Sequence, residues 1–296
     1  MSNLLTLTQP NRFADATHAS DSAWRQQGSL WSNLRQVCEL LTIQPPATAD
    51  DEDTLFQHVR FKAGQRIHRI GQVFDTLYIV NSGFLKTVHI DEYGNEQVLS
   101  FPMKGDLLGI DGIHKQHYAS EAIALSDCDM ILVPYKTFTS LGRIHVELEQ
   151  AMFSVMSREI VREQMMISML SALSAEAKVA RFLTNLGERF NQMGYSGRSF
   201  NLRMTRQEIG SYLGLTLETV SRTLSALNEL GMISVEQREI KLIDPVALKI
   251  LRRLPPAKAR IKVSEIVSEK VTEKVNALVN KNILPQWNKD MAVALN

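Results

Sequence analysis

Two kinds of hydrophobic spacing divide the chain. Residues 56–134 contain short β-type runs separated by glycines, a pattern typical of an antiparallel β-roll or barrel. Turn sequences at 81–83 and 93–95 predict two hairpins within this part. Residues 144–171 contain neither proline nor glycine and predict one long helix.

One stripe of the long helix has the spacing of a coiled-coil seam, because its positions alternate by three and four residues. A helix that packs only on its own roll would need a single apolar stripe. Met152, Met165, Met166 and Met169 supply a second stripe for that packing, so the seam favours pairing of two chains. The expected dimer interface consists of Phe153, Met156, Ile160, Glu163, Ile167 and Leu170, among which only Glu163 is charged.

Residues 205–230 have the pattern of two short helices joined at a glycine. Thr205 and Glu208 form a T-x-x-E capping box that can begin the first helix, and Gly214 permits a tight turn. Thr216 can cap the second helix, whose apolar positions are spaced by four and then three residues. This arrangement predicts a helix-turn-helix.

The free face of the second helix carries side chains that can read DNA bases. Glu218, Ser221 and Arg222 lie at i, i+3 and i+4, so they project together. Arginine can donate two hydrogen bonds to guanine, glutamate can accept one from cytosine, and serine can reach a base or a phosphate. The alternative is a helical hairpin on which Glu218 and Arg222 form an ordinary surface pair. The candidate DNA-binding residues are Thr205, Arg206, Thr216, Glu218, Thr219, Ser221 and Arg222.

The flanking segments complete a winged helix-turn-helix. β-type runs at 232–235 and 240–243 surround a polar turn and predict a small hairpin, the wing. Residues 175–190 have an apolar face and predict a supporting helix. The sequence therefore predicts an α+β protein with a poorly ordered leader (1–55), a β-roll (56–143), a dimerisation helix (144–172), a winged helix-turn-helix domain (173–254) and an extra helical tail (255–296).

Composition excludes several classes of function. No apolar run approaches the roughly 18 residues of a membrane span, and no signal peptide begins the chain, so we expect a cytoplasmic protein. Cys38 and Cys128 are too few for a disulfide framework or a four-thiolate metal site. No catalytic constellation stands out, and we expect neither an enzyme nor a metal site. Residues 171–254 carry 12 basic and 8 acidic side chains, against 14 and 20 in residues 1–170, which fits contact with DNA phosphates.

The chain resembles the cyclic-AMP receptor protein superfamily of bacterial transcription regulators, and most closely its fumarate-and-nitrate-reductase regulator (FNR) class. The resemblance covers residues 56–245 and rests on FKAGQ, LYIVNSGFLKTV, GDLLGID and MTRQEIGSYLGLTLETVSRTL. The last stretch holds the E-x-x-S-R signature of the class at Glu218, Ser221 and Arg222. The resemblance implies a homodimer that binds double-stranded DNA at a palindrome with half-sites similar to TTGAT. It also implies contact with RNA polymerase, for which the turn at 92–96 is a counterpart.

The chain departs from both sensing chemistries that the resemblance implies. Cyclic-nucleotide binders hold the phosphate with a Gly-Glu-Leu turn and an Arg-Ser pair, whereas this chain has Gly109-Ile110-Asp111 and Ala119-Ser120. Oxygen sensors hold an iron–sulfur cluster on four cysteines. Here Cys38 matches one ligand, and the other three positions fall on Ser29, Ser32 and Leu132. We therefore expect neither cyclic AMP nor an iron–sulfur cluster.

A second hypothesis is an effector-gated regulator with haem or a small metabolite in the roll. His114 and His117 lie in the loop after Gly109, where haem or a metal could be ligated. A solvated loop is the simpler interpretation. The effector, the target genes and the choice between activation and repression do not follow from the sequence.

Overall fold

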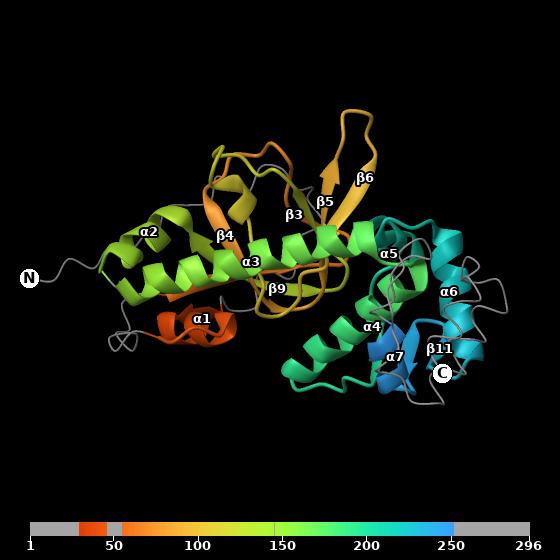
Figure 1. Ribbon diagram of the computed structural model, residues 1–296. Coiled ribbons are helices and arrows are strands. Elements are labelled where there is room, and N and C mark those ends of the chain that lie inside the picture. The colour runs from red at the N-terminus through yellow and green to blue at the C-terminus, as the bar shows by residue number, and fades with distance from the viewer. Residues whose placement is uncertain (1–29, 46–54, 145, 252–296) are drawn as a thin grey trace, which may run out of the picture.

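The structure is a computed structural model that describes residues 30–45, 55–144 and 146–251. Figure 1 shows the long helix α3 (Val146–Ala172) running across the molecule, with the β-roll beside it and a helical domain at its C-terminal end. No helix in the described ranges is long and apolar enough to span a membrane. The predicted α+β class is confirmed.

Two antiparallel sheets form the roll, as the glycine-punctuated β pattern predicts. One has the strand order β1-β2-β9-β4-β7 and the other the order β3-β8-β5-β6. Leu77, Ile79, Leu85 and Ile131 are fully buried in the roll core. The strands are β1 (Trp31–Asn33), β2 (Leu55–Phe61), β3 (Arg66–His68), β4 (Thr76–Ser82), β5 (Leu85–Ile90), β6 (Glu96–Ser100), β7 (Leu107–Leu108), β8 (Glu121–Ala124) and β9 (Cys128–Pro134), with the short 3-10 helix η2 (Ile110–Gly112) after β7.

The hairpin predicted at 81–83 is wrong. β4 pairs with β7 and β9, while β5 pairs with β6 and β8, so the chain crosses from one sheet to the other at Gly83. Gly83 has φ +98°, and a Cβ there would lie 2.5 Å from Cys128 Sγ. Glycine is therefore needed for a close crossing rather than for a hairpin. The hairpin predicted at 93–95 is confirmed, because β5 and β6 pair directly across that turn.

The prediction of a poorly ordered leader is wrong for residues 30–45. β1 extends the larger sheet by pairing with β2, and helix α1 (Leu34–Leu41) follows directly. Asn33 and Gln36 form a capping box at its start. The apolar side of α1 packs on the roll core through Leu34, Val37, Cys38 and Leu41. Residues 1–29 and 46–54 of the predicted leader, and the predicted tail over 255–296, lie outside the described residues.

The predicted long helix is observed as α3, preceded by α2 (Tyr135–Ile144). Val155 and Met169 of α3 are buried, and Met152 and Met166 are half-buried. Met165, by contrast, is exposed. The predicted methionine stripe therefore packs against the rest of the chain only in part.

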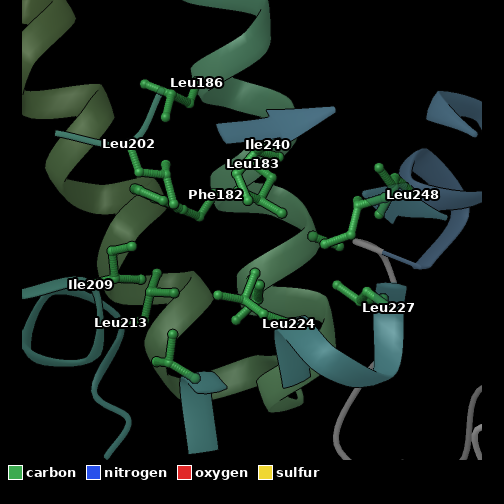
Figure 2. Packing of buried hydrophobic residues seen from close by; sticks show 14 of the residues in the cluster. Phe182, Leu183, Leu186, Leu202, Ile209, Leu213, Leu224, Leu227, Ile240 and Leu248 are labelled. Atoms are coloured by element: carbon green, nitrogen blue, oxygen red, sulfur yellow. The ribbon is translucent and has the colours of Figure 1, made fainter. Parts of the chain in front are cut away.

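The C-terminal domain joins four helices to a three-stranded sheet of order β10-β12-β11. Figure 2 shows large apolar side chains from all four helices and from β12 meeting in one core, among them Phe182, Leu213, Leu224 and Leu248. The predicted supporting helix and wing are confirmed, whereas β10 and α7 were too short to show a hydrophobic period. The elements are α4 (Ala175–Gln192), β10 (Ser199–Asn201), α5 (Arg206–Leu213), α6 (Leu217–Glu229), β11 (Ile233–Glu236), β12 (Glu239–Leu242) and α7 (Pro245–Leu251).

Candidate DNA-binding interface

The predicted capping box begins α5. The Thr205 hydroxyl accepts a hydrogen bond from the Glu208 backbone N–H at 3.1 Å, and the Glu208 carboxylate accepts one from the Thr205 backbone N–H at 2.7 Å. Two of the helix's free N–H groups are thereby satisfied. Gly214 ends α5 in the left-handed conformation, with φ +61°.

A close backbone approach holds α5 against the start of α6. The Leu215 backbone N–H donates to the Gly210 carbonyl at 2.9 Å, and a Cβ on Gly210 would lie only 2.6 Å from the Leu215 carbonyl oxygen. The turn of the helix-turn-helix therefore has no room for a side chain at position 210. Thr216 caps α6 by accepting from the Thr219 backbone N–H at 3.1 Å, as predicted.

Helix α6 buries one face and leaves the other open. Val220, Leu224 and Leu227 are buried, which agrees with the predicted apolar stripe. On the opposite face the side chains of Glu218 and Arg222 are 76% and 71% exposed, and Arg222 Nε lies 3.8 Å from Glu218 Oε1. The surface pair that formed the alternative interpretation is thus present but loose, and both groups remain accessible to a ligand.

The other candidate residues lie around the same two helix starts. Thr205 and Arg206 are exposed at the start of α5, and Thr216 is exposed at the start of α6. Thr219 and Ser221 are half-buried on α6. The structure therefore gathers these residues at the N-terminal ends of the two helices, where the free N–H groups favour phosphate oxygens.

Two exposed basic residues beside the helix-turn-helix were not among the predicted contacts: Arg203 before α5, and Arg238 in the turn of the wing. Arg203 and Arg238 are both exposed, and the Arg238 carbonyl accepts a hydrogen bond at 2.8 Å from the backbone of Leu202. The Asn228 side chain at the end of α6 accepts from the Val235 backbone N–H at 3.0 Å, which ties the wing to that helix. The sequence did offer a signal for Arg238, since it is a basic residue in the tight turn of the predicted wing.

Helix α5 also contacts the roll. Lys86 Nζ on β5 lies 3.1 Å from Glu208 Oε1, and the Ser211 hydroxyl accepts from the Val98 backbone N–H of edge strand β6 at 2.9 Å. Burial favours a raised pKa for Glu208, but hydrogen bonds from Thr205 and Lys86 outweigh it, and the pKa lies below the usual range of a glutamate. The glutamate that caps the helix-turn-helix is therefore also its charged link to the roll.

The predicted dimer seam lies on an open face of α3. Phe153 and Ile167 are 60% and 67% exposed, and Ile160 and Leu170 are exposed as well. Glu163 is exposed between them, and Met156 is half-buried. A row of exposed large apolar side chains at this spacing is typical of a surface that packs against a partner.

The cysteine surroundings do not fit an iron–sulfur cluster. Cys38 is fully buried, and burial raises the pKa of its thiol to about 11, which disfavours the thiolate that a cluster requires. The Ser32 hydroxyl hydrogen-bonds His58 Nε2 at 2.8 Å, Leu132 lies on β9, and Ser29 lies outside the described residues. Within the described ranges, no group of three or more potential metal ligands is found.

Aromatic side chains of the roll pack against the turn at Gly109 and Gly112. His68 stacks on Tyr118 with ring centroids 4.1 Å apart, and Phe74 packs edge-on against Tyr118. Beside them the Ser120 hydroxyl donates to the Asp111 carboxylate at 2.7 Å. A carboxylate at this turn would repel a phosphate. His114 and His117 are exposed on the loop that follows.

Comparisons with known proteins agree with this architecture. The cyclic nucleotide-binding domain model matches residues 58–145, and the Crp-like helix-turn-helix domain model matches residues 177–251. The chain is 37% identical to the transcriptional regulatory protein btr of Bordetella pertussis over 218 residues, covering 74% of this chain and 90% of that protein. It is 36% identical to the fumarate and nitrate reduction regulatory protein of Escherichia coli, covering 73% and 86%.

The chain belongs to the Crp/FNR family of transcription regulators. Among solved structures, FixK2 from Bradyrhizobium japonicum matches with a TM-score of 0.63 and 25% identity, covering 68% of this chain and 99% of that one. This Crp/FNR chain is thus a DNA-binding regulator and not an enzyme.

Proposed function

We propose that this Crp/FNR regulator binds, as a homodimer, a DNA palindrome with TTGAT-like half-sites. The observation that carries the proposal is the exposed face of α6, where Glu218, Ser221 and Arg222 project from the first two turns. In a helix-turn-helix these turns meet base edges in the major groove. Arg203 and Arg238 supply cations for the phosphates beside the groove.

The binding experiment compares two sites and two arginines. Arg222→Ala should weaken binding to the TTGAT palindrome by roughly 1–3 kcal/mol while changing binding to a scrambled site little, because only the specific site gains from base hydrogen bonds. Arg69→Ala is the matched control, since Arg69 is an exposed arginine on the roll. Fluorescence anisotropy at fixed salt measures the affinity of the unaltered protein and of each variant for each of the two sites. Equal losses on both sites would mean that Arg222 contacts only phosphate.

Dimerisation through α3 belongs to the same proposal. The exposed seam from Phe153 to Leu170 would bury its apolar side chains against a second copy. Two copies of α6 would then be related by a two-fold axis, as a palindromic site requires. The exposed turn at 92–96, with Tyr93 at its tip, is proposed to contact RNA polymerase.

We further propose that neither an iron–sulfur cluster nor cyclic AMP controls this regulator. Support comes from the buried, protonated Cys38 thiol and from the Asp111 carboxylate beside Ser120. The size of the apolar cavity beside Cys38 weighs against the second hypothesis, haem in the roll. A cavity of about 30 Å³ lined by Cys38 and apolar side chains lies between the roll and α1, α2 and α3, far too small for haem. An absorption spectrum of the purified protein tests this directly, because haem gives a Soret band and a cluster gives a visible shoulder.

A further inference from the structure

A polar cleft lies where the roll, α1, α3 and α4 meet. Its volume is about 640 Å³, within the range of roughly 300–1,000 Å³ of small-molecule sites. Figure 1 shows α1 and α4 on the same side of α3, and side chains from all three helices line the cleft. It is separate from the exposed face of α6.

Four cations line the cleft against two anions. Lys104, Arg158, Arg162 and Arg189 face Glu39 and Asp106. Asp106, on the turn before β7, accepts hydrogen bonds from Arg162 at 3.0 Å and from Arg189. One carboxylate of the roll thus pairs with an arginine from α3 and with another from α4. The excess positive charge favours a negatively charged ligand.

Unlike Arg162 and Arg189, Arg158 forms no salt bridge among the described residues, although its charge acts on the neighbouring Glu159 carboxylate. Its Nε is buried and makes no hydrogen bond, and its Nη2 has only a long contact of 3.5 Å with the Leu41 carbonyl. A buried guanidinium N–H without a partner is costly, by roughly 1–3 kcal/mol or more. Neighbouring Arg162, one helical turn along, has both Asp106 and Glu159 as partners. The side chain of Arg158 is therefore left to bind something that enters the cleft.

We propose that this cleft binds a small polyanion, a molecule with a phosphoryl group or several carboxylates, and that Arg158 is its anchor. Guanidinium forks bind such groups with paired, charge-assisted hydrogen bonds. Lys104, exposed on the turn beside Asp106, adds a second charge at the mouth of the cleft. The polar lining suits a charged ligand better than an apolar one.

The position of the cleft gives the ligand a role in regulation, a step that rests on the proposed function. Asp106 belongs to the roll, Arg162 to the helix with the dimer seam, and Arg189 to the first helix of the DNA-binding domain. A polyanion that engages Arg189 or Arg162 competes with Asp106 for them. Its binding would therefore shift how the DNA-binding domain is held on the roll, and DNA would in turn change the affinity for the polyanion.

Calorimetric titration of the full-length protein tests the site without DNA. The probes are pyrophosphate and citrate at matched ionic strength, so that phosphoryl and carboxylate recognition are distinguished. We expect at least one probe to bind, and we expect Arg158→Gln to lower the affinity for that probe tenfold or more. Arg69→Gln is the matched control and should leave the affinity unchanged. Thermal unfolding checks that both variants fold.

Lys104→Gln provides an independent variant on an exposed turn and should weaken binding about threefold. The inference would be overturned if the unaltered protein bound neither probe at 10 mM, roughly the limit of weak metabolite binding. Equal binding by the unaltered protein and Arg158→Gln would also overturn it, because the anion would then sit elsewhere. A protein that binds a probe as expected but ignores the TTGAT palindrome would retain the site and refute the proposed function.

Discussion

At Cys38, burial decides the chemistry of a single residue. The resemblance to the FNR class places a cluster ligand there, but the thiol lies fully buried in the apolar face of α1. Desolvation penalises the thiolate, so the pKa rises from 9.0 to about 11. The same residue type that would bind iron in an exposed, electropositive setting instead acts as a small apolar group.

This burial predicts an alkaline loss of stability. The unfolded thiol loses its proton near pH 9, whereas the folded thiol keeps it to about pH 11, so the contribution of Cys38 is complete below pH 9 and declines as pH rises through that window. The slope is at most about 1.4 kcal/mol per pH unit. Urea unfolding of the unaltered protein and of Cys38→Ala between pH 8 and 10.5 measures how the stability contributed by Cys38 changes with pH. A difference between the two that does not change with pH would contradict the raised pKa.

At the scale of elements, the joint between α5 and α6 depends on one glycine. Gly210 is helical and needs no unusual φ. Glycine is required there because a Cβ would clash with the Leu215 carbonyl oxygen. The capping residues at either side set where each helix begins, and this contact sets how closely the second follows the first.

Gly210→Ala should therefore destabilise the protein although alanine is the better helix former. We expect a loss of roughly 1–3 kcal/mol, because backbone must move to admit the methyl group. Gly142→Ala in α2 is the matched control: among the described residues, the nearest atom to a Cβ there would be Glu149 Cβ at 3.9 Å, and the change should be neutral or stabilising by up to about 1 kcal/mol. Denaturant unfolding measures the stability of both variants. Similar effects of the two changes would refute the close approach of the Leu215 carbonyl to Gly210.

At the scale of the whole molecule, the roll and the DNA-binding domain are joined by polar contacts and by the packing of Phe101 of the roll on Phe182 and Tyr212. The side chains of Lys86 and Glu208 are only 13% and 17% exposed, and Lys86 also lies 3.4 Å from Glu96. Ser211 satisfies a backbone N–H of the edge strand β6. These contacts fix the direction of α6 relative to the roll.

Lys86→Gln should loosen that attachment. Removing one partner of a half-buried pair leaves Glu208 uncompensated, and we expect a loss of roughly 1–3 kcal/mol together with faster proteolysis between the two domains. Lys62→Gln is the control, since Lys62 pairs with Asp127 at 60% and 66% exposure and should contribute less than about 1 kcal/mol. If both variants unfold alike, Lys86 does not hold the domains together.

Dimer formation gives the second prediction at this scale. Glu163 would meet its own copy across the α3 seam, so two carboxylates would repel each other between Ile160 and Ile167. Glu163→Ala should shift the monomer–dimer equilibrium toward dimer. Glu149→Ala, on the side of α3 near α2, should leave it unchanged. Sedimentation at several concentrations decides; a weakened dimer in Glu163→Ala would mean that this side chain points away from the seam.

The sequence by itself determined the features that depend on neighbouring residues. The caps at Thr205 and Thr216, the turn at Gly214 and the apolar stripe of α6 were all readable, because each involves residues within a few positions of one another. The exposed face of α6 followed from the same stripe. The wing and the supporting helix were likewise long enough to show their period.

Only the tertiary structure decided the contacts between distant segments. The crossing at Gly83 depends on the distant Cys128, so the local pattern suggested a hairpin there. β1 and α1 are held in place by β2 and the roll core, so the local pattern suggested a poorly ordered leader. The cleft has the same origin: Asp106 and Arg189 are 83 positions apart and meet only when α4 packs beside the roll. Packing free energy, which depends on every segment at once, selected these arrangements over those that local preference favoured.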